Sequence, residues 1–115
     1  MTSSDQLVAR HIDAFNSADA ARLLADFTDD AEWVTGDYTV PSGELAAFFE
    51  GAMQSLTPRL ALVRVIDGSD VVVAEMTESW THEAEAKTAA LVAVFDLVGG
   101  KISRAKIYRE GSADA

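Results

Sequence analysis

The sequence predicts a single α+β domain in which three helical segments precede a mostly antiparallel sheet. Apolar residues recur with a helical period in the first half of the chain, whereas they alternate or run continuously in the second half. The chain has 115 residues, 49% of them hydrophobic, which is enough for one core without disulfides. We expect one domain over residues 1–115, with flexible ends at 1–4 and 111–115.

Two helices are predicted at the start of the chain. The first begins near Asp5, with Ser4 or Asp5 as its cap, because apolar residues fall on one helical face: Leu7, Val8, Ile12 and Phe15. His11 occupies the remaining position of that face. Residues 16–19 interrupt the helix, and Asp19 can cap a second helix that ends near residues 28–30.

A short strand, a loop and a third helix complete the first half. Residues 31–35 alternate as a strand, and residues 36–41 form a loop. Ser42 caps the third helix, and Thr57-Pro58 stops it. Its apolar side consists of Leu45, Phe48, Phe49, Ala52 and Leu56.

The residue pattern of the second half predicts four strands, at residues 60–66, 71–81, 88–98 and 101–110. Residues 67–70 form a turn, residues 82–87 are a polar stretch, and Gly99-Gly100 closes a tight hairpin. The strand at 88–98 is apolar on both faces, so both faces require cover. Helices cover one face, and a second copy of the chain is the simplest cover for the other.

Charge and composition exclude several function classes. The formal net charge of −10 disfavours nucleic acids and anionic membranes as partners. Cysteine is absent and there are two histidines, so we expect no metal site and no cofactor. No apolar run approaches the roughly 20 residues of a membrane span, and no leader opens the chain, so a cytoplasmic protein is expected.

Two segments carry a family resemblance. The run His11-Ile-Asp-Ala-Phe-Asn16 and the step Phe27-Thr-Asp-Asp-Ala-Glu-Trp33 resemble the opening of the nuclear-transport-factor-2-like superfamily. The helix start at Ser42-Gly43-Glu44 and the hairpin from Phe95 to Ile102 fit as well. That superfamily includes ketosteroid isomerase, the SnoaL-like polyketide cyclases and limonene epoxide hydrolase.

The resemblance implies a cone-shaped fold, in which a curved sheet wraps around the long first helix and encloses a deep apolar pocket. It also implies a homodimer through the outer face of the sheet. It does not fix the function, because this fold hosts isomerases, cyclases, hydrolases and non-catalytic binders.

The catalytic residues of ketosteroid isomerase are largely not retained. Its oxyanion-donating tyrosine falls on His11, its general-base aspartate on Thr35, and its second aspartate near Leu91. Only the first of these positions keeps a polar group capable of similar work, which argues against steroid isomerisation by the same residues.

His11 and Glu78 are the candidate catalytic residues. A histidine on an apolar helical face is either a structural residue bonded to a nearby carbonyl or carboxylate, or an acid/base and hydrogen-bond donor. Alternation along 71–81 places Glu78 on the more apolar face, where burial raises a carboxyl pKa. Glu75 becomes the candidate if the strand has the opposite phase, and a rim position or surface pairing is the alternative for Glu78.

Further residues are candidates for binding the ligand, although core packing is an alternative for each aromatic or methionine side chain. They are Trp33, Thr35, Tyr38, Phe49, Met53, Met76, Trp80, Phe95 and Arg109. By the resemblance Arg109 faces inward, where it can neutralise an acidic ligand or a buried glutamate; a surface salt bridge is the alternative.

The functional hypothesis is a small cofactor-independent enzyme that transfers a proton on an apolar, carbonyl-bearing small molecule, by isomerisation, cyclisation or hydration. His11 donates to the developing oxyanion and Glu78 is the base. The alternative is a non-catalytic module of the same fold that binds a hydrophobic ligand or a partner.

Overall fold

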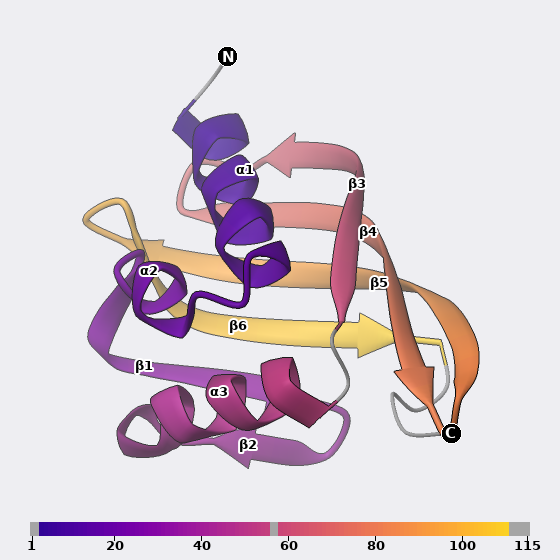
Figure 1. The fold of residues 1–115 in the computed structure, drawn as a ribbon. Helices are drawn as coiled ribbons and strands as arrows, with labels where there is room; N and C mark the ends of the chain where they lie inside the picture. The colour runs from indigo at the N-terminus through magenta and orange to yellow at the C-terminus, as the bar shows by residue number, and fades with distance from the viewer. Residues whose placement is uncertain (1–2, 56–57, 111–115) are drawn as a thin grey trace.

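The computed structural model describes residues 3–55 and 58–110 (Figure 1). The first part of the chain forms helices α1 (Ser3–Asn16) and α2 (Ala20–Leu24), followed by strands β1 (Phe27–Thr35) and β2 (Tyr38–Val40). A 3-10 turn, η1 (Ser42–Glu44), leads into helix α3 (Leu45–Ser55). The last part forms strands β3 (Arg59–Asp67), β4 (Val71–His82), β5 (Glu85–Val98) and β6 (Lys101–Arg109).

The strands form one curved, open sheet in the order β2-β1-β6-β5-β4-β3. Neighbouring strands are antiparallel except for β1 and β6, which run parallel and join the early part of the chain to its end. The helices lie over one face of the sheet, with α1 crossing the long strands and α3 in front of β1 and β2 (Figure 1). The predicted α+β class, with a mixed and mostly antiparallel sheet around the first helix, is confirmed.

The second helix is shorter than predicted. Asp19 caps it as expected, because its Oδ1 accepts a hydrogen bond of 3.0 Å from the Arg22 amide. The helix ends at Leu24, however, and residues 27–35 form β1. The predicted end near residues 28–30 is wrong because Phe27 pairs with Ile102 of β6, a contact that no local pattern reveals.

Several other element boundaries differ from the predictions. The segment 36–41 contains β2, which turns back on β1 at Gly36. Ser42 does not cap α3, because it lies in η1 and the preceding Pro41 makes no side-chain capping bond. Ser3 and Ser4 belong to α1 rather than to a flexible end. Leu56, Thr57 and the ends at 1–2 and 111–115 lie outside the described residues.

The hairpin between β4 and β5 is longer than predicted, whereas the hairpin between β5 and β6 agrees with the prediction. β4 and β5 remain paired up to His82 and Glu85, around a turn in which Glu83 and Ala84 have positive φ. The polar stretch 82–87 is therefore mostly strand. At the other end of β5, Gly99 and Gly100 both have positive φ, as a two-residue hairpin of the predicted kind requires.

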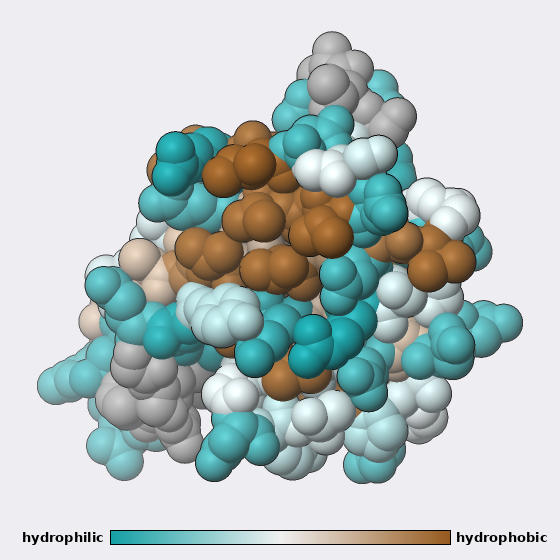
Figure 2. Space-filling view, turned by 180° about the vertical axis from the view of Figure 1, so that it is seen from behind, coloured by the Kyte–Doolittle hydropathy of each residue, from teal (hydrophilic) through white to brown (hydrophobic). Residues whose placement is uncertain are grey.

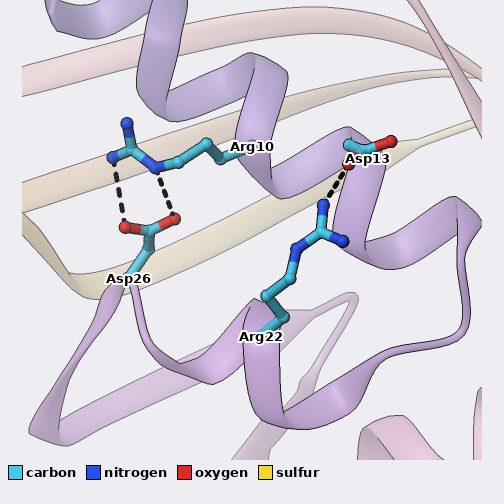
Figure 3. A network of polar contacts seen from close by, with 4 residues as sticks. All are labelled: Arg10, Asp13, Arg22 and Asp26. Carbon is cyan, nitrogen blue, oxygen red and sulfur yellow. Dashed lines mark hydrogen bonds and ion pairs between the residues drawn. The ribbon is translucent and has the colours of Figure 1, made fainter.

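Polar contacts fix the helices to one another and to the sheet (Figure 3). The Arg10 guanidinium donates two hydrogen bonds of 3.1 Å to Asp26, just before β1. Arg22 of α2 donates to Asp13 of α1. The core lies between the helices and the inner face of the sheet. None of the described helices is both long and apolar enough to span a membrane.

The opposite face of the sheet carries an apolar surface (Figure 2). We call it the outer patch, and it comprises Ile66, Val71, Val73, Val92 and Val94. Ile66 and Val71 are exposed, and the other three are half-buried. The pairing of Val73 with both Ile66 and Val94 makes these side chains contiguous across β3, β4 and β5.

Candidate functional site

One cavity of about 870 Å³ lies between the helices and the inner face of the sheet. It is lined mainly by apolar and aromatic side chains from α1, α3 and all six described strands. Most of the predicted site residues line it: His11, Trp33, Thr35, Tyr38, Phe49, Met76, Glu78, Trp80 and Arg109. A cavity of this size accommodates a small organic ligand.

Met53 and Phe95 are not among the lining residues. Both are buried in the core, with 6% and 0% of their surfaces exposed. The ring of His11 lies 5.1 Å from the Phe95 ring, so Phe95 is covered by the helix that crosses it. For these two residues core packing, rather than the predicted pocket lining, describes the structure.

His11 lies within a set of aromatic side chains, which together form the aromatic end of the cavity. Its neighbours are Phe15 on the same helix, Phe27 and Trp33 on β1, and Phe95 on β5. The ring centroids of these four residues lie between 5.1 and 6.3 Å from that of His11. This arrangement removes the imidazole from water.

The environment of His11 keeps it neutral at physiological pH. Only 1% of its surface is exposed, and burial lowers its pKa from 6.5 to about 4, opposed weakly by the charge of Asp26. Its Nδ1 atom has no hydrogen-bond partner among the described residues. A neutral imidazole provides one donor and one acceptor, so His11 can hydrogen-bond a ligand but is a poor reservoir of protons.

Glu78 and Arg109 form an ion pair at another part of the cavity. Glu78 is 5% exposed, and Arg109 Nη2 donates a hydrogen bond to its Oε1. Burial raises the pKa of Glu78, while the charge and hydrogen bond of Arg109 act in the opposite direction. Of the predicted alternatives for Arg109, neutralisation of a buried glutamate is the one observed, not a surface salt bridge.

The side chains of β4 alternate between the inner and outer faces as the sequence favoured. Glu78 faces the cavity, and Glu75 faces outward, where it accepts a hydrogen bond of 2.7 Å from Arg64 Nε. Trp80, two residues beyond Glu78 on the same face, is 6% exposed. We call Glu78, Trp80 and Arg109 the charged end of the cavity.

The two ends lie over different parts of the sheet. His11 contacts Phe95, which pairs with Val72, and Glu78 follows Val72 by six residues in β4. Accordingly, the pKa shift of His11 has no contribution from Glu78, nor that of Glu78 from His11. One cavity therefore holds two distinct polar sites.

Comparison with known families identifies the family that has this fold. Residues 8–105 match the family model of the SnoaL-like domain. The chain belongs to the SnoaL-like family. No curated protein shows a significant match.

Solved structures agree with this assignment at the level of the fold. The SnoaL-like chain is similar to an NTF2-like protein of unknown function from Burkholderia pseudomallei (TM-score 0.86, 21% identity, covering 96% of this chain and 92% of that one). It is also similar to a putative polyketide cyclase from Xanthomonas campestris (0.83, 21%, 92% and 89%). A third is AclR, a putative hydroxylase from Streptomyces galilaeus (0.80, 18%, 93% and 78%).

The SnoaL-like cavity includes residues that are not among the predicted site residues. Phe15, Leu60, Leu91 and Ile107 also line it. The helical period of α1 and the alternation of the strands were signals that could have identified three of them: Phe15, Leu91 and Ile107. Thr35 and Leu91, which replace the two ketosteroid isomerase aspartates, face the same cavity, so those positions provide no carboxylate.

Asn16 supports the site from outside it. Its Nδ2 donates to the Leu60 carbonyl at 2.9 Å, and its Oδ1 accepts from the Leu60 amide at 2.6 Å. This pair of bonds ties the end of α1 to the start of β3. The sequence suggested only a helix break at Asn16, because a contact across 44 residues leaves no local signal.

Metal ligands are not gathered anywhere in the described part of the chain. Within residues 3–55 and 58–110, no group of three or more histidine, cysteine, aspartate or glutamate side chains is placed to hold an ion. Besides the polar residues of its two ends, the cavity is lined by Thr35, Asp37, Tyr38, Lys106 and Tyr108.

Proposed function

We propose that this SnoaL-like domain is a cofactor-independent enzyme that transfers a proton on an apolar, carbonyl-bearing small molecule bound in the cavity. The observation that carries the proposal is the buried Glu78 carboxylate, held by Arg109 inside an apolar enclosure. A desolvated carboxylate is a stronger base than an exposed one, and the arginine keeps its ionised form accessible.

The proposed step balances without any co-reactant. The Glu78 carboxylate takes the proton from the carbon next to the carbonyl, the C–H electron pair forms a carbon–carbon double bond, and the carbonyl oxygen gains the negative charge. Return of the proton from Glu78 to a different carbon gives isomerisation. Attack of the enolate carbon on a second carbonyl carbon gives cyclisation, and the proton on Glu78 then passes to the new alkoxide. His11 contributes as a neutral hydrogen-bond donor to an oxygen of the ligand.

The comparisons support small-molecule chemistry of this kind without specifying it. A putative polyketide cyclase and a putative hydroxylase share the fold, each at 21% identity or less. Glu78 and Arg109 supply what enolate formation requires: a base that is buried and a cation beside it.

The test is base-catalysed exchange on a simple ketone. The probe is 4-acetylbiphenyl in D₂O, and loss of the methyl signal in the ¹H NMR spectrum reports removal of the α-proton. We expect Glu78→Gln to slow exchange at least about 100-fold, because it removes the base while keeping the shape. Glu75→Gln, on the outer face, is the matched control and should exchange like the wild type.

Two results would contradict the proposal. One is exchange by Glu78→Gln at the wild-type rate. The other is exchange by the wild type no faster than in buffer alone, although 4-acetylbiphenyl binds.

That second result would favour the other candidate function, a non-catalytic module that binds a hydrophobic ligand. The occupation of both isomerase carboxylate positions by Thr35 and Leu91 is the observation in its favour. A ligand held by such a module raises the melting temperature and is recovered unchanged.

We also propose that a second copy of the chain covers the outer patch. A two-fold pairing buries the same apolar surface on both protomers at once, and it is the commonest closed symmetry. The net charge of −10 makes apolar contact, rather than charge complementarity, the basis for two identical chains to associate. Light scattering should give the mass of a dimer for the wild type and of a monomer for Ile66→Glu. A monomeric wild type at concentrations near 100 µM, about a hundredfold above a micromolar Kd, would contradict this proposal.

A further inference from the structure

Three buried polar atoms around the cavity have no hydrogen-bond partner within residues 3–55 and 58–110. They are His11 Nδ1 at the aromatic end, and Trp80 Nε1 and Arg109 Nε at the charged end. Such groups are costly, because each has given up its hydrogen bonds to water without replacement. All three residues line the cavity, so a small rotation of each side chain that turns its nitrogen toward the cavity lets a ligand supply the missing partner.

The two unpartnered groups at the charged end restrict the chemistry of that partner. Indole and guanidinium nitrogens donate hydrogen bonds and do not accept them. Arg109 also retains N–H groups beyond the one that Glu78 receives. The ligand atom that meets them must therefore be an acceptor, and in an apolar cavity an oxygen bonded to carbon is the natural choice.

These donors lie beside the proposed base. Trp80 and Glu78 are two residues apart on the inner face of β4, so their side chains are roughly 7 Å apart at the strand. Arg109 contacts Glu78 directly. A carbonyl oxygen bound by Trp80 and Arg109 places the α-carbon of the ligand near Glu78, whereas His11 lies over a different part of the sheet.

We propose that Trp80 and Arg109 bind the carbonyl oxygen of the ligand next to Glu78, and that His11 binds a second oxygen at the aromatic end. This inference rests on the proposed function and specifies its ligand. The ligand is an elongated, mostly apolar and ring-containing molecule with oxygen at both ends. The oxyanion that forms when Glu78 takes the proton is stabilised by Trp80 and Arg109, not by His11.

The two sites are tested by binding of matched probes to the wild-type protein. The two-oxygen probes are 4-acetyl-4′-hydroxybiphenyl and the shorter 6-acetyl-2-naphthol, each compared by calorimetry with its parent ketone that lacks the hydroxyl. We expect at least one of them to bind about tenfold more tightly than its parent, the worth of one well-formed hydrogen bond. Absence of this gain at both lengths would overturn the site at His11.

Variants assign each oxygen to its end of the cavity. In His11→Phe, which keeps a ring at that position, the gain from the hydroxyl should disappear. In Trp80→Phe, the gain from the acetyl group, measured as 4-acetylbiphenyl against biphenyl, should fall about five- to tenfold. Biphenyl serves as the internal control, because it reports loss of ring packing without any hydrogen bond.

Binding and exchange separate this inference from the proposed function. If Glu78→Gln exchanges at the wild-type rate while the probe pattern holds, the base is wrong and the two oxygen sites stand. If Glu78 is the base but Trp80→Phe leaves the gain from the acetyl group unchanged, the oxygen site at the charged end is wrong. An acetyl gain lost in His11→Phe instead would show that the ligand lies the other way round.

Discussion

Both ends of the cavity bury a titratable side chain, but the surroundings of the two side chains differ. Each places a titratable side chain out of water, His11 at 1% exposure and Glu78 at 5%. At the aromatic end the histidine is surrounded by rings and has its pKa lowered to about 4. At the charged end Arg109 stands against the glutamate and opposes the rise in its pKa.

This difference in surroundings bears on the proposed roles of the two residues. Burial favours the uncharged form of both groups, so it lowers the pKa of a histidine and raises that of a glutamate. At the charged end Arg109 hydrogen-bonds the carboxylate and favours its ionised form, whereas at the aromatic end the charge of Asp26 does not offset the effect of burial on His11. This contrast supports the proposed roles, with Glu78 as the base and His11 as a neutral hydrogen-bond donor.

Removing the counter-ion should have the largest effect on stability. Arg109→Met leaves Glu78 buried and unpaired, which we expect to lower the free energy of unfolding by about 3–5 kcal/mol near neutral pH. The pKa of Glu78 is raised in the folded state, so its protonation restores stability as the pH falls through that value. Urea denaturation near neutral pH and in mild acid measures both effects.

The exposed pair on the outer face is the matched control for this experiment. Arg64→Met breaks the contact with Glu75 but should cost no more than about 1 kcal/mol, because both side chains remain solvated. An equal loss in the two variants would show that burial does not distinguish the pairs.

The pH dependence of stability tests the aromatic end, with a somewhat smaller effect. An unfolded chain binds a proton at His11 below about pH 6.5, whereas the folded protein does so only near its pKa of about 4. Stability should therefore fall as the pH drops through this interval, by roughly 3 kcal/mol in all. His11→Phe should lack this contribution in parallel denaturation curves. An identical pH slope in both proteins would mean that His11 finds a partner when protonated.

The sequence predicted what depends on local periodicity. The helical period of α1 placed His11 on its buried face, and the alternation of β4 placed Glu78 inward and Glu75 outward. Both predictions follow from the burial of apolar side chains, which determines the face that each element turns toward the core. The motif at Phe27 to Trp33 also identified the fold family correctly.

What depends on pairing between distant segments was not predictable from local pattern. Residues 27–30 form a strand because β6 lies beside them, although their composition suits a helix end. The distance between His11 and Glu78 depends on where α1 crosses the sheet, and the sequence does not show that position. The sequence alone therefore predicts one reaction centre for both residues. The unpartnered nitrogen of Trp80 could be recognised only once its surroundings were known.

The most direct test of a cavity with two distinct ends is a crystal structure with 4-acetyl-4′-hydroxybiphenyl bound. We expect the acetyl oxygen within hydrogen-bond distance of Trp80 Nε1 or the Arg109 guanidinium, the methyl group facing Glu78, and the hydroxyl at His11. A probe bound outside the cavity, or one with its acetyl group at His11 and no oxygen near Trp80 and Arg109, would contradict this expectation.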